Sequence, residues 1–346
     1  MEKLKIAVLG AGTWGMALAR MLSLSGQDVT VWSALSKEVE TYPVTRRHPN
    51  LPGMVIPEEI AFDGDIACCQ RAQIVLFAVP SPFVRGTCEA AAPYLHEGQI
   101  VVDVAKGIEP GTLLTMTGIL SQVLEKAGKA LPVVALSGPT HAEEVARDMP
   151  TTIVSSSRSR EAAVLVQHVM TTRCMRVYIN SDPLGVELCG ALKNIIALAS
   201  GISTGLGFGD NAKAAIITRG MAEIRRLGLA MGASEATFSG LAGIGDLIVT
   251  ATSMHSRNNR CGMLIGQGRK PEDAVREVGM VVEGINALPA AMELSRKLQV
   301  EMPICEAVNK VIGGEDPARI VQELMARDRK DEITGERTES ALLGNL

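Results

Sequence analysis

The stretch that constrains the fold of this chain most strongly is residues 4–32. Ile6–Leu9 is a continuous apolar run, which is typical of a strand buried on both faces of a parallel sheet. Residues 10–15 then read G-x-G-x-x-G, and Met16–Leu22 follows without a helix breaker. Asp28–Trp32 supplies a second strand. The order strand, glycine turn, helix and strand therefore predicts a βαβ unit.

The glycines of this turn stand where dinucleotide binding needs them. Gly10 permits the tight turn, Gly12 lets the backbone approach a pyrophosphate, and Gly15 lets the helix pack closely on the strand. Free N–H groups at the helix N-terminus are available to the phosphates. The alternative is a glycine-rich turn without a ligand, and the complete βαβ context argues against it. We therefore expect a Rossmann-type, doubly wound α/β domain over residues 1–180.

The end of the second strand bears on which dinucleotide is bound. An NAD-specific site usually has Asp or Glu there, which binds the ribose 2′-OH. Here the strand ends in Trp32-Ser33-Ala34, and the nearest acid is Glu38. A 2′-phosphate would then meet no repelling carboxylate, while Ser33 could donate a hydrogen bond and Lys37 is near in sequence. The sequence favours NADPH over NADH, although no arginine follows the strand directly.

Length, charge and cysteine usage exclude several classes of protein. A chain of 346 residues predicts two domains, and its net charge of −4 gives no basic surface for nucleic acid. The seven cysteines include no C-x-x-C, so buried reduced thiols are expected rather than disulfides. The five histidines form no H-E-x-x-H and no cluster with cysteine, so we predict no metal site.

No uncharged apolar stretch reaches the ~18–20 residues that a membrane span needs. The longest candidate, residues 194–209, is interrupted by serine and glycine. Lys3 and Lys5 before an apolar run imitate a signal peptide, but that run is the first strand and glycine turn, and Arg20 interrupts it. We therefore expect a cytoplasmic protein without a membrane span.

Strands and helices alternate through residue 180, as a doubly wound domain requires. We expect a surface loop over residues 42–57, which hold four prolines, and a helix over about 83–94. Further strands are expected at Gln73–Val79, Ile100–Ala105, Pro132–Leu136, Thr151–Ser155 and Met175–Ile179.

Two strand ends in this half predict contacts with a ligand, because ligands of open α/β sheets bind at the carboxyl edge. Lys106 directly follows a buried strand and precedes a glycine, so we expect it to contact an anionic ligand. The small residues Ser137-Gly138-Pro139-Thr140 follow the next strand and would allow close approach of a substrate or nicotinamide.

After Asn180 the pattern predicts helices only, which places an all-α domain at residues 181–346. A helix is expected over 183–200, a glycine-rich break over 201–210, and a second helix over about 211–229. Amphipathic helices continue to about Ala326, and a polar tail follows from about residue 327.

Lys193 lies in the middle of the first, mostly apolar helix of this domain. A buried lysine is costly unless it is paired or its pKa falls, so Lys193 is a candidate general acid or base, with Asp246 as its partner. The alternative is an exposed lysine whose stem covers apolar surface. Arg257 and Asn258 suit a phosphate, and the alternative there is a helix cap with a solvated arginine.

These motifs together resemble the bacterial type of NAD(P)-dependent glycerol-3-phosphate dehydrogenase, nearly end to end from Ile6 to about residue 325. The matching segments are GAGTWGMALA (10–19), LFAVPS (76–81), AKG (105–107), LSGPTHAEEV (136–145), the runs over 192–224 and 240–260, and VEG (282–284).

The resemblance implies reversible reduction of dihydroxyacetone phosphate to sn-glycerol 3-phosphate, which feeds phospholipid synthesis, and a homodimer. It implies that Lys193 is the general acid/base and that Lys106 is shared by the substrate and cofactor pockets, with Asp246 orienting Lys193. The implied substrate contacts are Lys106, Gly138, Thr140, Lys193, Asp246, Ser256, Arg257 and Asn258. The implied cofactor positions are Gly10, Gly12, Thr13, Trp14, Gly15, Ser33, Lys106, Ala142, Arg257, Val281 and Glu283.

Ser33 departs from the family pattern, since many members have a basic residue just after the second strand. Two other functions remain open. One is a related dehydrogenase that acts on a phosphorylated sugar acid or a branched hydroxy acid. The other is a dinucleotide sensor without catalysis, which the presence of both Lys106 and Lys193 in the expected contexts argues against.

Overall fold

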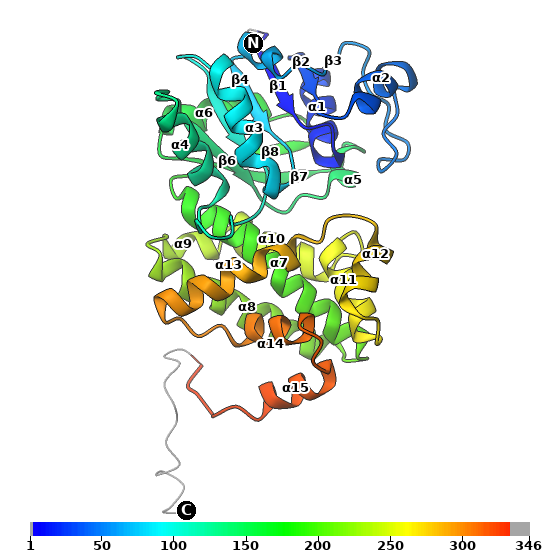
Figure 1. Cartoon of the computed structure of the whole chain (residues 1–346), viewed down its shortest axis with the longest axis vertical. Coiled ribbons are helices and arrows are strands. Elements are labelled where there is room, and N and C mark those ends of the chain that lie inside the picture. Colours follow the sequence, from blue (N-terminus) through cyan, green and yellow to red (C-terminus); the bar gives the residue numbers. More distant parts are fainter. Residues whose placement is uncertain (1–2, 333–346) are drawn as a thin grey trace, which may run out of the picture.

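The structure, a computed structural model that describes residues 3–332, has a sheet region and a helical region stacked along its long axis (Figure 1). The sheet has eight strands in the order β3-β2-β1-β4-β5-β6-β7-β8. Its strands are β1 (Lys5–Leu9), β2 (Asp28–Trp32), β3 (Ala61–Asp63), β4 (Ile74–Phe77), β5 (Ile100–Asp103), β6 (Val133–Ser137), β7 (Thr151–Ser157) and β8 (Met175–Asn180).

Helices cover both faces of this sheet, as the doubly wound prediction requires. Side chains of β1 alternate between two cores: Ile6 and Val8 pack with helices α1 and α6, while Ala7 and Leu9 pack with α3 and α4. This alternation explains why β1 reads as a continuous apolar run. The helical segments of the sheet region are α1 (Thr13–Leu24), α2 (Ser36–Thr45), η1 (Ile66–Arg71), η2 (Ser81–Phe83), α3 (Val84–Ala91), η3 (Ala92–Tyr94), α4 (Met116–Lys126), α5 (Ala142–Val145) and α6 (Arg160–Met170).

The structure differs from the sequence prediction at three places in this region. β7 runs antiparallel to β6, so the last two strands oppose the other six. The short edge strand β3 was not predicted, because three residues carry little periodicity. The expected loop at 42–57 begins later, because α2 continues through Pro43 to Thr45. Tyr42 is buried and its ring packs 6.0 Å from Phe62, which holds this last turn of the helix in place.

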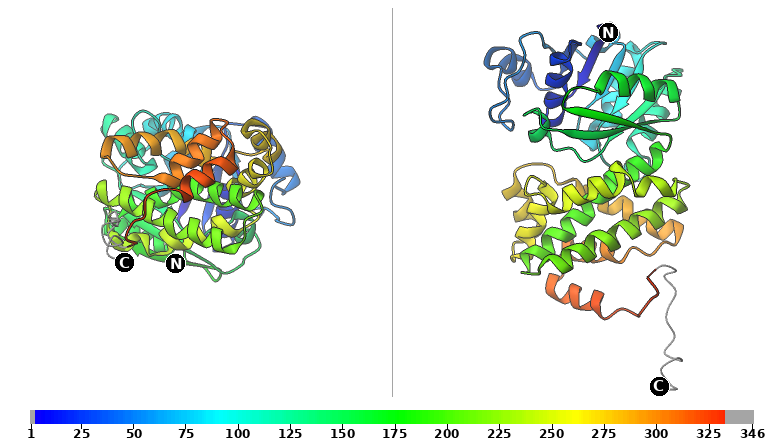
Figure 2. Two further views of the ribbon diagram at one scale, coloured as in Figure 1. Left: turned by 90° about the horizontal axis from the view of Figure 1, so that it is seen from below. Right: turned by 180° about the vertical axis from the view of Figure 1, so that it is seen from behind.

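The helical region begins three residues after β8 and contains no strand within the described residues. Its segments are α7 (Pro183–Gly205), α8 (Asp210–Ala230), α9 (Glu235–Phe238), η4 (Leu241–Gly245), α10 (Asp246–Thr252), α11 (Arg257–Gly266), α12 (Pro271–Val278), α13 (Glu283–Leu298), α14 (Pro303–Ile312) and α15 (Pro317–Met325). α7 leads out of the sheet region (Figure 2, right) and packs against α8, α10, α11, α13 and α14.

α7 is the core helix of this region, and it is longer than predicted. By length and composition alone it could cross a membrane, but 94% of its most apolar window is buried inside the protein. The expected glycine-rich break starts five residues too early, because Gly201 and Gly205 are inside the helix. A Cβ at Gly201 would lie 2.1 Å from Asn259 O of α11, and a Cβ at Gly262 of α11 would lie 2.1 Å from Leu198 O. These glycines therefore let the two helix backbones touch.

All seven cysteines are free thiols and six are buried, as predicted. Of the predicted polar tail, residues 327–332 are described, and Lys330 Nζ pairs with Glu301 Oε2 at 2.5 Å. The remainder of that tail, residues 333–346, lies outside the described residues.

Candidate active site

The carboxyl edge of the sheet faces the helical region, and polar groups from both regions meet there. Two of the bonds that cross the boundary lie at this edge. Lys106 Nζ, just after β5, lies 2.6 Å from Asp246 Oδ2 at the start of α10. Ser81 Oγ, after β4, donates to Glu283 Oε2 at the start of α13 over 2.9 Å. Ligands of open α/β sheets bind at this edge, so we place the candidate site here.

The glycine turn after β1 forms one side of this site. Gly10 has φ +124°, and a Cβ there would lie 2.8 Å from the Ala78 carbonyl carbon. A Cβ at Gly15 would lie 2.1 Å from Gly10 O, so neither position tolerates a side chain. A Cβ at Gly12 would meet nothing within 4 Å, and α1 begins there without a side-chain cap. The turn thus leaves space and free N–H groups for a dinucleotide phosphate, and this cradle fits the predicted cofactor.

At the end of β2, the structure contradicts one premise of the sequence prediction. A carboxylate does stand there: Ser33 Oγ donates to Glu38 Oε2 over 2.5 Å. Because Ser33 is buried and its hydroxyl is engaged, it is not free to bind a 2′-phosphate as proposed. Lys37 is exposed. The two sequence arguments for NADPH, a free Ser33 hydroxyl and the absence of a carboxylate at the strand end, are therefore not supported by the structure.

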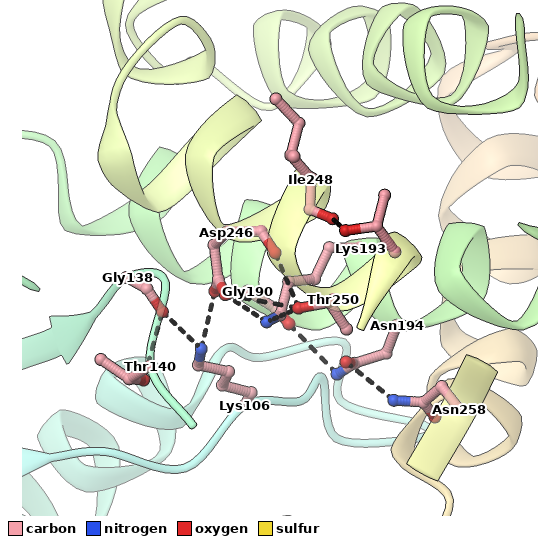
Figure 3. A network of polar contacts seen from close by, with 11 residues as sticks. Lys106, Gly138, Thr140, Gly190, Lys193, Asn194, Asp246, Ile248, Thr250 and Asn258 are labelled. Atoms are coloured by element: carbon pink, nitrogen blue, oxygen red, sulfur yellow. Dashed lines mark hydrogen bonds and ion pairs between the residues drawn. The ribbon is translucent and has the colours of Figure 1, made fainter. Parts of the chain in front are cut away.

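Two lysines share one carboxylate at the centre of the site (Figure 3). Lys193 Nζ contacts Asp246 Oδ1 and donates to Thr250 Oγ1 over 2.6 Å, while Lys106 binds the other oxygen of Asp246. Lys193 is 5% exposed and Asp246 is fully buried. The alternative of an exposed Lys193 is therefore wrong, and the predicted pairing with Asp246 is present.

The environment of Lys193 adjusts its protonation to the neutral range. Burial lowers the pKa of the ammonium group most, the Asp246 carboxylate raises it, and the neighbouring Lys106 lowers it again, with a balance at about 7. A lysine with this pKa exists in both protonation states near neutral pH. It is therefore able to give or take a proton.

A glycine-rich segment and one threonine position Asp246. The π-helical turn η4 precedes α10, and a Cβ at Gly243 would lie 2.2 Å from Phe238 O, so the turn requires glycine. Thr250 lies one turn after Asp246 and donates to its backbone oxygen over 2.7 Å. Sequence reasoning missed Thr250, although its i+4 spacing from Asp246 on a helix was a usable signal.

The end of β6 supplies another wall of the site. Lys106 Nζ and Thr140 Oγ1 each donate to Gly138 O over 3.2 Å. Nearby, Ser137 Oγ and His141 Nε2 are buried and have no hydrogen-bond partner among the described residues. Burial, and then the charge of Lys193, lower the pKa of His141, which sequence reasoning had overlooked. Buried polar atoms without a partner are uncommon in folded proteins, which makes these two candidates for a contact with a bound ligand.

The Ser-Arg-Asn run of α11 has mixed roles. Ser256 Oγ accepts from Asn259 N over 3.2 Å, so it caps the helix as the alternative interpretation held. Asn258 Nδ2 donates to Asn194 Oδ1 over 3.0 Å, and Asn258 Oδ1 accepts from Gly284 N over 2.8 Å. Arg257 is half-buried, and its side chain forms no hydrogen bond or ion pair with the described residues. Its guanidinium is therefore free to bind an anion.

The other predicted cofactor positions are spread around this edge. Thr13 and Trp14 begin α1, and Ala142 begins α5, which packs beside α1. Glu283 reaches the sheet through its bond with Ser81. Val281 is 40% exposed and precedes α13. Among residues 3–332, no group of three or more His, Cys, Asp or Glu side chains is arranged to hold a metal ion.

Comparisons with known proteins agree with this arrangement. The family model for the N-terminus of NAD-dependent glycerol-3-phosphate dehydrogenase matches residues 5–163, and the model for its C-terminus matches residues 182–322. An NAD(P)+-dependent glycerol-3-phosphate dehydrogenase 2 of Lactobacillus delbrueckii subsp. bulgaricus is 63% identical over 334 residues, covering 95% of this chain and 99% of the relative. An NAD(P)+-dependent glycerol-3-phosphate dehydrogenase of Pelotomaculum thermopropionicum is 48% identical over 347 residues, covering 99% of this chain and 99% of the relative.

A crystal structure of glycerol-3-phosphate dehydrogenase from Coxiella burnetii has a similar fold. It superposes with a TM-score of 0.88 at 35% identity, covering 94% of this chain and 99% of that chain. This similarity confirms a Rossmann-like sheet region followed by an all-helical region.

Proposed function

Because this chain belongs to the NAD(P)-dependent glycerol-3-phosphate dehydrogenase family, we propose that it interconverts dihydroxyacetone phosphate and sn-glycerol 3-phosphate with an NAD(P) cofactor. The observation that supports this most is the Lys106–Asp246–Lys193 cluster at the carboxyl edge of the sheet, in which Asp246 and Lys193 are buried and Lys106 is half-buried. That cluster lies where a substrate can contact both the cofactor side and the helical region.

The glycine turn at residues 10–15 and the N-terminus of α1 would hold the dinucleotide pyrophosphate. When bound, the reduced nicotinamide supplies the hydride that C2 of the substrate accepts. The carbonyl oxygen of Gly138 accepts from Lys106 Nζ over 3.2 Å, and a Cβ at Gly138 would lie 3.1 Å from Ile153 Cα, so glycine lets this segment pack closely on β7.

Lys193 is the proton donor in this proposal. Reduction of a ketone builds negative charge on its oxygen, and a protonated lysine beside that oxygen donates the proton as the charge develops. The pKa of Lys193, lowered by burial to about 7, lets the same side chain take the proton back in the reverse direction. A positioned general acid or base typically accelerates a reaction by about 10²–10⁴-fold.

Asp246 and Lys106 support that role. Asp246 orients Lys193 through one oxygen and Lys106 through the other, so the carboxylate fixes the separation of the two amines. Lys106 adds positive charge next to the developing oxyanion. Thr250, which accepts from Lys193 over 2.6 Å, limits the rotation of the amine.

Arg257 is the main phosphate ligand in this proposal. It is the cation of the run that has no partner among the described residues, whereas the amide of Asn258 is bonded to Asn194 and Gly284. Asn258 therefore chiefly holds α7, α11 and α13 together and has one N–H left for the substrate. Binding energy at the phosphate, remote from C2, would position the carbonyl for reaction.

We retain four further expectations as predictions. They are the division of the chain into domains at residue 180, the homodimer, the cytoplasmic location and the remaining contacts implied by the family resemblance. The homodimer can be measured by light scattering of the purified protein.

The test is oxidation of NADH and of NADPH by the purified protein with dihydroxyacetone phosphate, followed by near-ultraviolet absorbance. We expect rapid loss of the reduced cofactor. A panel of unphosphorylated ketones and phosphorylated sugar acids separates this activity from that of a related dehydrogenase. Tight dinucleotide binding without turnover of any of these substrates would instead indicate a sensor.

A further inference from the structure

The end of β2 holds a carboxylate that comes from a helix rather than from the strand. We propose that Glu38 selects NADH over NADPH, an inference that rests on the proposed function. Its carboxylate would accept a hydrogen bond from the ribose 2′-OH and repel a 2′-phosphate. Glu38 thus performs from the first turn of α2 the task that an acid at the strand end usually performs.

The backbone places this strand end beside the glycine turn. Gly10 N donates to Trp32 O over 2.9 Å, so the last residue of β2 is bonded directly to the first glycine. Ser33 comes next, and its backbone N donates to Asp63 O over 3.2 Å. The adenosine ribose of a dinucleotide bound on such a turn lies at the end of the second strand.

One hydroxyl group ties Glu38 to this position. Ser33 Oγ accepts from Leu35 N over 3.1 Å and donates to Glu38 Oε2 over 2.5 Å. The residue before α2 and the first turn of α2 are therefore both attached to the strand end. A hydrogen bond to a charged acceptor is stronger than a neutral one, so this arrangement holds the carboxylate in place.

Tyr42 approaches the same carboxylate from one helical turn further on. Burial raises the pKa of Tyr42 to about 12, and the charge of Glu38 and a hydrogen bond to it contribute further. His48 is buried beside the ring of Tyr42, at 5.5 Å. Burial lowers the pKa of His48 although Glu38 raises it, so the imidazole stays neutral at neutral pH.

The nearby cations do not offset the charge of Glu38. The guanidinium of Arg46 is committed to backbone oxygens: Nη1 donates to Pro57 O over 2.9 Å and Nη2 donates to Glu58 O over 3.3 Å. Lys37 and Arg47 are both exposed, so neither is fixed beside the carboxylate, and Lys37 does not share a helix face with Glu38. No arginine follows the strand. A 2′-phosphate would therefore meet a fixed negative charge without a fixed positive one.

Acceptor capacity is left for the ribose. An ionised carboxylate has about four acceptor positions, and the hydroxyl of Ser33 uses one of them. The 2′-OH of NADH is a donor and fits a remaining position. The 2′-phosphate of NADPH has only acceptors in its ionised form and does not.

Binding of each dinucleotide to the purified protein tests this inference without relying on turnover. The chain has two tryptophans, Trp14 in the glycine turn and Trp32 at the end of β2, so intrinsic fluorescence reports on this site. We expect the Kd for NADPH to exceed that for NADH by about tenfold or more, since a buried hydrogen bond to a charged group contributes about that much. In Glu38→Gln, the NADPH Kd should fall about tenfold and the NADH Kd should rise.

Glu40→Gln is the matched control, because Glu40 lies on the same helix and is exposed. It removes the same charge and should leave both Kd values within about twofold. Ala34→Arg is a second variant that removes no contact of Glu38, and the added guanidinium should tighten NADPH binding selectively. Equal binding of the two dinucleotides by the unchanged protein, or the same shift in the Glu40 and Glu38 variants, would overturn the inference while leaving the proposed function intact. Failure of both dinucleotides to bind would overturn the two together.

Discussion

The sheet region and the helical region build the same site by different means. In the sheet region the contributing residues follow strand ends: the glycine turn follows β1, Lys106 follows β5 and Gly138 follows β6. Parallel strands bring such ends to one edge whatever their side chains are. In the helical region, Lys193 and Asp246 are 53 residues apart on different helices. Only the packing of α7 against α10 brings their charges together.

This difference teaches where each half is vulnerable. The sheet side depends mainly on backbone positions, such as the turn at Gly10 and Gly15. The helical side depends on the spacing of packed helices, such as the close contact of α7 with α11 at Gly201 and Gly262. Substitutions in the helical region should therefore abolish the proton-transfer chemistry while dinucleotide binding by the sheet region survives.

Replacing the central amine should break the site most sharply. In Lys193→Met we expect kcat to fall by about 10² or more, the usual contribution of a general acid or base, while NADH binding is retained. Stopped-flow or steady-state kinetics together with tryptophan fluorescence measure the two quantities. Lys297→Met, an exposed lysine of α13, is the control and should keep normal turnover. Near-normal turnover of Lys193→Met would remove Lys193 from its role.

Loss of the free cation should sharpen the distinction between binding and chemistry. In Arg257→Ala we expect the KM for dihydroxyacetone phosphate to rise about 30-fold, because a charge-assisted hydrogen bond contributes about 2 kcal/mol. Arg260→Ala, three residues on and exposed, is the matched control. Steady-state kinetics on both variants give the comparison, and an unchanged KM in Arg257→Ala would contradict the assignment.

Separating the helices should show that the helical region depends on their close approach. Gly262→Ala places a methyl group 2.1 Å from Leu198 O, so we expect a loss of about 2 kcal/mol in the free energy of unfolding. Gly86→Ala in α3, where a Cβ meets nothing within 4 Å, should instead gain about 0.5–1 kcal/mol. Urea unfolding measures both. Equal effects of the two substitutions would show that helix propensity, not close packing, decides.

Removing the charge of Asp246 should shift the pH profile. Asp246 raises the pKa of Lys193, so Asp246→Asn should lower that pKa by about 1–3 units from about 7. Reduction needs the protonated amine, so the fall in kcat/KM with rising pH should move to lower pH. Rates measured across pH, with Asp273→Asn of α12 as an exposed control, test this. An unmoved inflection would show that Lys193 is not the titrating group.

Much of the sheet region could be predicted because its signals are local. The apolar run of β1, the glycine turn and the alternation of strand and helix each show within a few residues. The antiparallel direction of β7 could not be predicted, because β7 has the composition of a buried strand and its direction depends on the partner. The sequence shows that Glu38 is the nearest acid after β2, but its position along the chain does not reveal the helical turn that brings it back to Ser33.

In the helical region the chemistry of Lys193 could be anticipated from the cost of burying a charge, and Asp246 from the need for a partner. The predicted break at Gly201 and Gly205 was wrong, because a glycine that marks a break in an isolated stretch can also permit two helix backbones to touch. Asn258 misled as well: its amide type suits a phosphate, yet its bonds to Asn194 and Gly284 show that it mostly joins helices.

The sequence by itself determined the fold class, the dinucleotide turn and the charged residues available for catalysis, because hydrophobic period and glycine spacing act over short stretches of chain. Only the tertiary structure decided which charges meet. It paired two lysines with one buried carboxylate, left Arg257 free, and brought Glu38 to the end of β2. The physical reason is that electrostatic interactions depend on distance and burial in space, and packing between distant elements sets both.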